Sequence, residues 1–156
     1  MGKTSLVRKF VLDQFSDDYI ATLGTKITKK RVKFDKDKNN VIDLYLMIWD
    51  VMGQKAFKKS QMRAYSDSKG AIIVCDITRH ETLLNLITWY SDILSVTKEI
   101  PILILANKSD LQNKAKFKKD DLKKIAKQLE APFLYTSAKT GENVEEAFRE
   151  IGKKLI

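Results

Sequence analysis

Short apolar runs alternate along the chain with stretches of helical periodicity, and this alternation limits the folds that the chain can adopt. Two runs, 71–76 and 102–106, have the length of strands that helices cover on both faces, and residues 133–135 would form a last strand. Three stretches carry apolar side chains at helical spacing: 83–94, 122–129 and 144–155. The pattern predicts one α/β domain over residues 1–156, with a mainly parallel sheet and helices on both faces.

An antiparallel hairpin is expected near the start of the chain. Residues 25–34 and 41–49 read as its strands, and the polar residues 35–40 read as its turn. In the second strand one face is apolar throughout, through Ile42, Leu44, Leu46 and Ile48. In the first strand Ile27 and Val32 are separated by an odd number of residues, so a regular strand would point their side chains to opposite faces. This predicts either a bulge or an edge strand.

Composition excludes several classes of protein. No apolar run approaches the ~20 residues of a membrane-spanning helix, no secretory signal opens the sequence, and the single cysteine, Cys75, allows no internal disulfide. A reducing, cytoplasmic location is therefore expected. The formal charge of +9 is concentrated in residues 26–38 and 114–127, each with seven Lys/Arg against two Asp. Solvated lysine-rich faces explain these patches most simply, and contacts with nucleic acid or an anionic membrane remain as alternatives.

The first residues carry a phosphate-binding signature. Gly2-Lys3-Thr4-Ser5 matches the end of the motif G-x-x-x-x-G-K-[ST] and leads into a helical pattern. In the whole motif the backbone N–H groups face phosphate oxygens, the lysine neutralises the outer phosphates and the hydroxyl is a ligand of Mg²⁺. Lys3 and Thr4 are thus candidates for these two roles.

Three more polar motifs each follow a predicted strand: Asp50-Val51-Met52-Gly53-Gln54, Asn107-Lys108-Ser109-Asp110 and Thr136-Ser137-Ala138-Lys139. Strand ends are where an open α/β sheet presents its ligand-binding loops. A carboxylate in the first motif could hold Mg²⁺ through its water shell. The order of all four motifs predicts one shared nucleotide site.

With these motifs the whole chain resembles the Ras-like small GTPases, most closely the Rab group. Residues 15–22 resemble the first switch of that family, and Thr22 stands nineteen positions after Lys3 as the family requires. The resemblance implies a P-loop fold and a monomeric switch that hydrolyses GTP to GDP and phosphate with Mg²⁺. It also implies effector, GTPase-activating and exchange-factor partners that bind through residues 15–34 and 50–66.

The resemblance assigns a guanine-binding role to the later motifs. Asp110 would accept two hydrogen bonds that guanine can donate and adenine cannot. Asn107 would brace the loop, and the backbone N–H of Ala138, in the loop of Ser137, would meet the guanine O6 atom. The remaining base contacts would come from Lys108 and Lys139 on the two faces and Phe15 at the edge.

The resemblance also assigns metal and hydrolytic roles. The implied ligands of Mg²⁺ are Thr4, Thr22 and Asp50. The implied catalytic residues are Lys3, Gly53, whose N–H would sense the γ-phosphate, and Gln54, which would orient the attacking water. Further nucleotide contacts are implied for Gly2, Ser5 and Tyr19.

Several features depart from the family pattern. Val51 and Met52 stand where Rab proteins usually have Thr-Ala, and Met52 either alters the room for the attacking water or only packs differently. The segment from Thr22 to Asp50 is longer than in Ras relatives, which lengthens the hairpin. The sequence ends without a cysteine for prenylation, so at most an electrostatic membrane contact is expected.

The sequence also lacks the strand and first glycine that precede Gly2 in the family. We expect this strand to lie in the centre of the sheet, between the strands ending at Trp49 and Cys75, and the translated start to lie upstream of Met1. Residues 1–156 alone are therefore expected to fold poorly. Two other functions stay open: a nucleotide-binding or interaction module without effective hydrolysis, and a nucleic-acid-binding protein.

Overall fold

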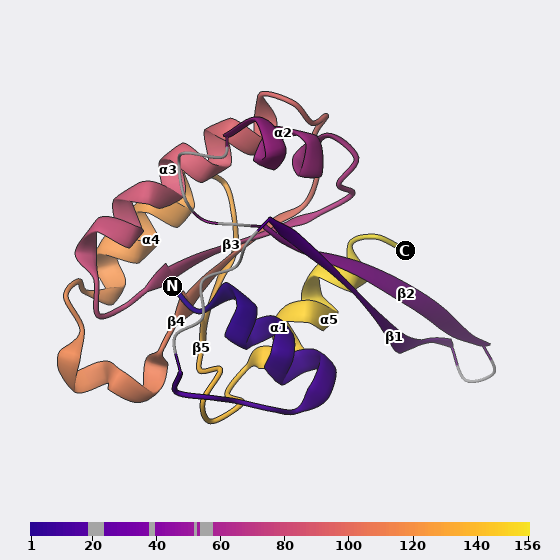
Figure 1. Cartoon of the computed structure of the whole chain (residues 1–156), viewed down its shortest axis with the longest axis horizontal. Helices are drawn as coiled ribbons and strands as arrows, with labels where there is room; N and C mark the ends of the chain where they lie inside the picture. Colours follow the sequence, from indigo (N-terminus) through magenta and orange to yellow (C-terminus); the bar gives the residue numbers. More distant parts are fainter. Residues whose placement is uncertain (19–23, 38–39, 52, 54–57) are drawn as a thin grey trace.

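A computed structural model describes residues 1–18, 24–37, 40–51, 53 and 58–156 (Figure 1). The helices are α1 (Lys3–Leu12), α2 (Lys58–Ser66), α3 (His80–Leu94), η2 (Ser109–Lys114, of 3-10 type), α4 (Lys119–Gln128) and α5 (Val144–Lys153). The strands are β1 (Thr25–Asp37), β2 (Asn40–Val51), β3 (Ala71–Asp76), β4 (Ile102–Asn107) and β5 (Phe133–Thr136). Within the described residues, no helix has the length and apolar character needed to cross a membrane.

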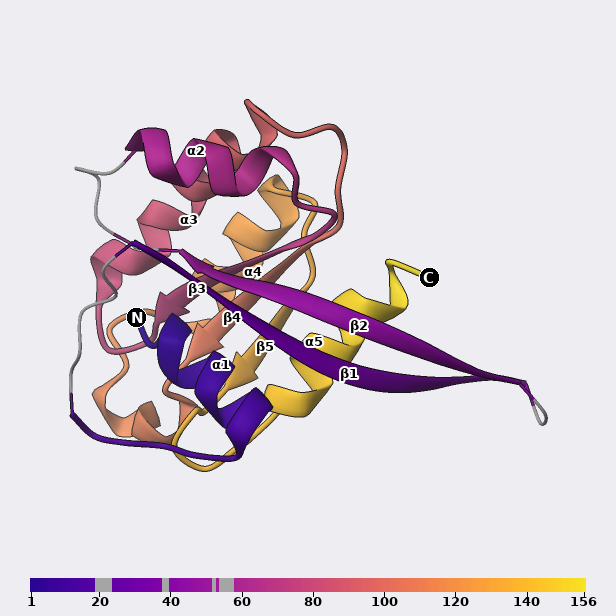
Figure 2. The same ribbon diagram turned by 45° about the vertical axis from the view of Figure 1, so that its right-hand side comes forward.

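Three strands form a parallel sheet in the order β3-β4-β5. Alternate side chains of β3 enter two different cores, because successive residues of a strand point to opposite faces. Ile73 and Cys75 pack with residues of α3 and α4. Val74 packs with residues of α1 and α5, so that helices cover both faces of the sheet (Figure 2). The prediction of strands covered on both faces is confirmed for residues 71–76 and 102–106, which form β3 and β4.

β1 and β2 form the predicted antiparallel hairpin, with strands longer than expected. Val32, Phe34 and Leu46 are buried in the core that α1 and α5 share. Ile27 lies on the opposite face, where it is 49% exposed. The register shifts only between Asp35 and Asp37, and β1 lies at an edge of its sheet. Of the two expectations for this strand, the edge position holds and a bulge between residues 27 and 32 does not.

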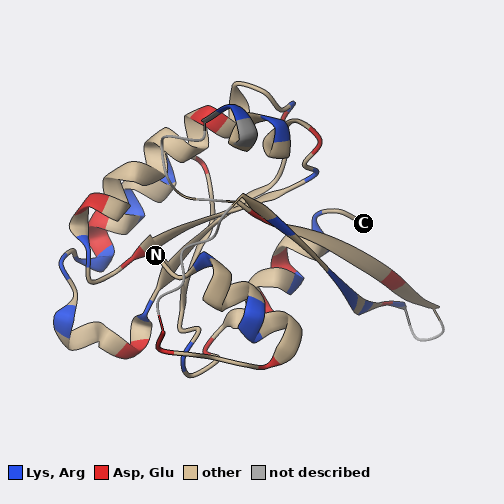
Figure 3. Ribbon diagram, viewed as in Figure 1, with Lys and Arg blue, Asp and Glu red and all other residues tan. Residues whose placement is uncertain are grey.

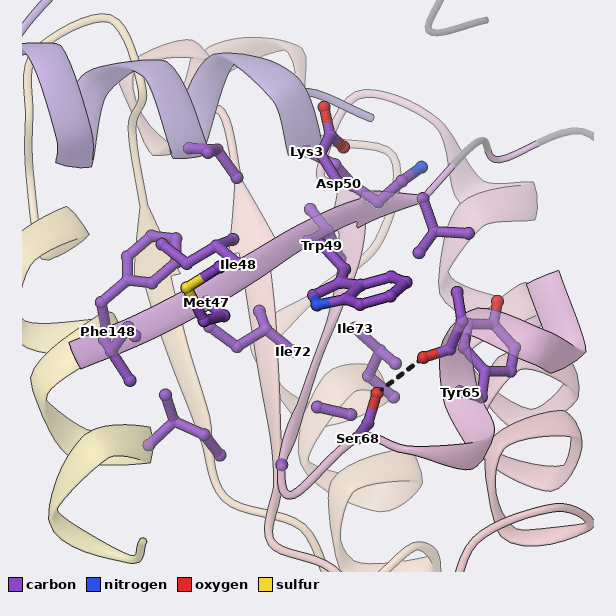
Figure 4. A pocket seen from close by; sticks show the side chains of 18 of the residues that line it. Lys3, Met47, Ile48, Trp49, Asp50, Tyr65, Ser68, Ile72, Ile73 and Phe148 are labelled. Carbon is purple, nitrogen blue, oxygen red and sulfur yellow. Dashed lines mark hydrogen bonds between the residues drawn. The ribbon is translucent and has the colours of Figure 1, made fainter. Parts of the chain in front are cut away.

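The hairpin and the parallel sheet do not hydrogen-bond to each other in the described part of the chain. An apolar cavity of about 540 Å³ separates β2 from β3 (Figure 4). Trp49 lines it from β2, Ile72 and Ile73 line it from β3, and Phe148 lines it from α5. The neighbouring edges of β2 and β3 thus face one another across a space lined by aliphatic and aromatic side chains.

The start of α5 differs from the capping box that the sequence predicts. The sequence suggests Asn143 as an N-cap with Glu146 as its reciprocal partner. Asn143 does stand at the N-cap of α5, but with a φ of 53° and without a side-chain cap hydrogen bond. Its Nδ2 instead donates to the carbonyl of Tyr135, 2.8 Å away. The side chain therefore ties α5 to β5, and the capping-box prediction is wrong.

Candidate functional site

The polar motifs of the sequence meet at one end of the molecule. β3, β4 and β5 are parallel and end at Asp76, Asn107 and Thr136, which are paired across the ladder. β2 brings Asp50 to the same region, where it contacts Thr4 of α1. The carboxyl ends of the strands and the start of α1 therefore converge, as the order of the motifs predicted.

Gly2 opens α1 in a conformation that favours glycine. Its φ is 89°, in the left-handed region, and its carbonyl accepts the N–H of Leu6 at 2.9 Å. A Cβ atom at this position would lie 2.3 Å from Nδ2 of Asn107. No acidic residue occupies the first turn of α1, so its free N–H groups and helix dipole are left to attract an anion.

Lys3 places its ammonium group beside Gly53. A Cβ atom on Gly53 would lie 2.7 Å from Nζ of Lys3, so any side chain there would displace the ammonium group from this position. Burial lowers the pKa of Lys3, and the charge of Asp50 partly offsets that effect. A desolvated ammonium gains strongly from an added anion, which makes this position suitable for a phosphate group.

Thr4 and Asp50 form a pair of oxygen donors. Oγ1 of Thr4 donates to Oδ2 of Asp50 at 2.5 Å, and Asp50 is only 4% exposed. Its Oδ1 atom is buried without a hydrogen-bond partner among the described residues. Hydroxyl and carboxylate oxygens are ligands that Mg²⁺ accepts, and an orphaned buried oxygen gains from such a cation. These two residues therefore fit Mg²⁺.

The described residues form no metal site with more protein ligands than this one. No group of three or more His, Cys, Asp or Glu residues in it is arranged to hold a metal ion. Mg²⁺ commonly keeps several waters and takes one or two protein carboxylates together with phosphate oxygens. The small donor set at Asp50 therefore suits a cation that arrives with a nucleotide.

Asn107 connects three segments that are far apart in the sequence. The residue is 1% exposed, and its Nδ2 donates to the carbonyl of Met1 at 3.1 Å. Its Oδ1 accepts the hydroxyl of Thr136 and the N–H of Ala138, both at 3.3 Å. A single amide side chain thus joins the start of the chain, the end of β4 and the loop after β5.

The same loops present the carboxylate of Asp110. Oγ of Ser137 donates to Oδ1 of Asp110 at 2.6 Å and accepts the N–H of Thr140 at 3.1 Å. Ser137 is fully buried, whereas Asp110 is exposed. A buried hydroxyl therefore orients an accessible carboxylate, and the second oxygen of that carboxylate can accept from a ligand.

Asp76 is a member of the site that the sequence reasoning missed. Its carboxylate is fully buried, accepts the N–H and hydroxyl of Thr78 at 2.9 and 2.6 Å, and lies 2.6 Å from Nζ of Lys108. Burial acts to raise the pKa of Asp76, but the hydrogen bonds from Lys108 and Thr78 outweigh it and lower that pKa. An aspartate directly after an apolar strand, the signal already used for Asp50, could have identified it.

The other residues predicted for the site form fewer contacts in the structure or lie outside the described residues. Ser5 is half-buried in the first turn of α1, Lys139 is exposed on the loop after β5, and Phe15 is 37% exposed. Four sequence-predicted positions lie outside the described residues: Tyr19, Thr22, Met52 and Gln54. The structure therefore brings together the residues predicted to bind phosphate, metal and base, and it does not describe three of the predicted switch residues, Tyr19, Thr22 and Gln54.

Comparison with known proteins shows what the chain is similar to. The model of the Ras family matches residues 1–156. The chain is 32% identical over 157 aligned positions to Ras-related protein Rab-13 of Bos taurus and to that of Canis lupus familiaris. It is 31% identical to Ras-related protein Rab-13 of Mesocricetus auratus. Each alignment covers 100% of the chain and 75% of the relative.

Proposed function

The chain belongs to the Ras family, and from this premise we propose that it is a guanine-nucleotide switch that hydrolyses GTP to GDP and phosphate. The observation that carries the proposal is the bridge made by Asn107, which joins the loop of Asp110 to the start of α1. A nucleotide needs its base and phosphates held at a defined separation, and this bridge would set that separation.

The base-binding half of the proposal rests on Asp110 and the loop after β5. The carboxylate, oriented by Ser137, would accept the guanine N1–H and amine. Adenine would leave the carboxylate unpaired, which is how a polar site rejects an analogue. The N–H of Ala138 donates to Asn107 at 3.3 Å and would be shared with the guanine O6. Lys108 and Lys139 would cover the two faces of the base, and Phe15 would cover its edge.

The phosphate half rests on the start of α1. Gly2, Lys3 and Ser5 would contact phosphate oxygens, and Thr4, Asp50 and Thr22 would hold Mg²⁺. The bound cation would neutralise charge on the β- and γ-phosphates. Support for this half comes from the desolvated ammonium of Lys3 and from the Oδ1 atom of Asp50, which has no hydrogen-bond partner in the described part of the chain.

The hydrolytic and switching roles are extended from the family. Gln54 would orient the attacking water, Gly53 would sense the γ-phosphate, and Tyr19 would contact the nucleotide. Loss of the γ-phosphate would release the segments around Thr22 and Gly53, which order around that group in Ras-like switches. Effectors and regulators would read the change through residues 15–34 and 50–66, on a cytoplasmic monomer.

We also propose that one extended strand fills the space between β2 and β3. What supports this is the apolar lining of the cavity and the two strand edges that face it, since strand edges are stable when they are paired. The strand expected from the family would satisfy both edges and supply the start of the phosphate loop. Expressing residues 1–156 alone and with the polypeptide encoded directly upstream, and comparing their thermal melts, tests this: equal, cooperative melts would refute it.

The second candidate function is a nucleotide-binding or interaction module without effective hydrolysis. The cavity favours it, because Lys3 and Gly53 line that unfilled space and could bind nucleotide there without aligning a water. Binding and turnover separate the two candidates. We expect a fluorescent GDP analogue to bind in the presence of Mg²⁺ and to be displaced by GTP but not by ATP. Binding without single-turnover release of phosphate from GTP would favour the module, and absence of guanine binding would refute both.

A further inference from the structure

The outward side of α3 carries a line of exposed apolar side chains. Leu84, Ile87 and Leu94 are 54%, 37% and 38% exposed, and the exposed Ser91 stands between them. Their positions follow the spacing at which residues of a helix share one side. We call these four residues the α3 stripe. The buried side of the same helix is formed by other residues, namely Thr82, Leu83, Leu86 and Ile93.

The α3 stripe belongs neither to the core nor to the site already described. The cavity between β2 and β3 is lined by other residues, and the switch partners are assigned to residues 15–34 and 50–66, outside α3. Isolated apolar side chains are ordinary on a protein surface. Several of them in one line along a helix are instead typical of a contact surface.

The α3 stripe lies on the side of α3 that faces α4. The two helices contact each other on the face of the parallel sheet opposite α1 and α5 (Figures 1 and 2). His80 stands four residues before Leu84 and therefore on the same side of α3. The centre of its ring lies 6.5 Å from that of Phe117, shortly before α4 begins. A partner that covers the stripe would thus also reach α4.

Lysines occupy the outward side of α4. Residues 114–127 hold seven Lys against two Asp, and Figure 3 shows blue recurring along α4. Nζ of Lys123 lies 4.0 Å from the carboxylate of Asp120. Lys124 and Lys127 are exposed, and neither forms an ion pair with a residue that the structure describes. Their two ammonium groups can therefore meet carboxylates of a partner.

The other acidic residues of this region lie at helix ends or toward α2. Glu81, in the first turn of α3, lies 2.7 Å from Arg79. Asp121 accepts the N–H of the residue that caps the start of α4, and Glu130 follows the end of that helix. Asp92 faces α2, close enough for its charge to add to burial in raising the pKa of a tyrosine there. The side of α4 that carries the exposed lysines thus remains basic.

We propose that the α3 stripe and the exposed lysines of α4 bind an acidic amphipathic helix of a partner protein. A straight line of apolar side chains along one helix fits the apolar side of a second helix. Carboxylates beside that apolar side would meet Lys124 and Lys127. An anionic bilayer is the poorer fit, because a flat surface over α3 would also meet Glu81 and Asp92. Nucleic acid fits less well too, since the stripe holds no aromatic ring on which bases could stack.

Peptide titrations test this proposal on the form of the protein that melts cooperatively. The probe is a fluorescent helical peptide of about 18 residues, or five turns, with leucines along one side and glutamates beside them. We expect saturable binding in fluorescence anisotropy. A scrambled peptide of the same composition should bind at least about tenfold more weakly, because it has no continuous apolar side.

One pair of variants tests the apolar contribution. Leu84→Ser with Ile87→Ser should weaken binding of the peptide by about tenfold or more, because both apolar contacts would be lost. Leu12→Ser with Val41→Ser is the matched control, since these side chains are 56% and 58% exposed elsewhere on the molecule. The control should bind the peptide as the parent does.

A second pair tests the charge contribution. Lys124→Glu with Lys127→Glu should weaken binding by about threefold to tenfold and reduce its dependence on salt. Lys36→Glu with Lys154→Glu makes the same change of charge at exposed positions on the hairpin and after α5. This control should retain most of the affinity.

A dye measurement remains informative if a substitution in the stripe destabilises the fold. Cys75 is fully buried, so a polarity-sensitive dye can be attached selectively to Ser91→Cys, with Lys36→Cys as the control. The dye at position 91 should shift to the blue when the peptide is added, and the dye at position 36 should not.

Three outcomes would overturn the proposal. They are equal affinity for the amphipathic and scrambled peptides; equal affinity of the stripe variant and its control; and a dye at position 91 that responds to vesicles of phosphatidylserine and phosphatidylcholine but not to the peptide, as a membrane occupant would give. The proposal goes beyond the proposed function and does not rest on it. Guanine-nucleotide binding should be equal in all of these variants, so the two proposals fail independently.

Discussion

Replacing Asp76 by Asn should uncouple Lys108 from the end of β3. Asp76 is fully buried and its partner Lys108 is 40% exposed, with 2.6 Å between their charged atoms. Breaking a fully buried ion pair costs about 3–5 kcal/mol, and an exposed pair contributes about 0–1 kcal/mol. Because water can reach the freed ammonium of Lys108, we expect a loss of about 1–2 kcal/mol, which lowers the melting temperature of a chain of this size by roughly 2–8 °C.

The stabilisation by Asp76 should depend on pH in a defined direction. The pKa of Asp76 is lowered in the folded protein, so its ionised form stabilises the fold at pH values above the unfolded pKa of about 3.9. That contribution disappears as the pH falls through the folded pKa. The difference in unfolding free energy between the parent and Asp76→Asn should therefore be full at pH 7 and shrink in acid.

Urea unfolding at pH 7 and at several acid values measures this difference. Asp43→Asn is the matched control, since it removes a carboxylate from an exposed pair with Arg31 and should leave the unfolding midpoint nearly unchanged. If Lys108 covers the base, Asp76→Asn should also speed release of bound GDP about threefold to tenfold. Equal stabilities of parent and Asp76→Asn at pH 7, or a difference that persists unchanged in acid, would refute the reasoning.

Three further substitutions test the nucleotide site. Asp110→Asn should shift the binding preference from GTP toward XTP, because the xanthine carbonyl pairs with an amide. Competition binding measures this preference, and an unchanged preference for GTP would exclude Asp110 from base recognition. Gln54→Leu should abolish stimulated hydrolysis and keep GTP binding, measured by phosphate release beside nucleotide binding; turnover equal to the parent would exclude its proposed role. Gly2→Ala should lower both stability and GDP affinity, because its Cβ would lie 2.3 Å from Nδ2 of Asn107; a melt and affinity equal to the parent would show that this contact relaxes freely.

The sequence alone determined the elements whose burial is periodic. Continuous apolar runs at 71–76 and 102–106 became β3 and β4, and alternation at 42, 44, 46 and 48 placed one face of β2 on the core. Such patterns are readable because side-chain direction follows from strand geometry. Gly2 and Gly53 could likewise be singled out by motif, although only the coordinates show which neighbours a Cβ atom would meet there.

The tertiary structure alone decided which polar groups are partners. Asp76 meets Lys108 across two strand ends, and Asn143 bonds Tyr135 rather than capping its own helix. No regular spacing in the sequence reveals either pairing, because each depends on how the strands and helices pack against one another. α2 also escaped prediction, as its residues 58–66 carry a polar, weakly periodic pattern. The place of the cavity was expected, because the family resemblance predicts a strand between those ending at Trp49 and Cys75, but its apolar lining became visible only with both sheets in place.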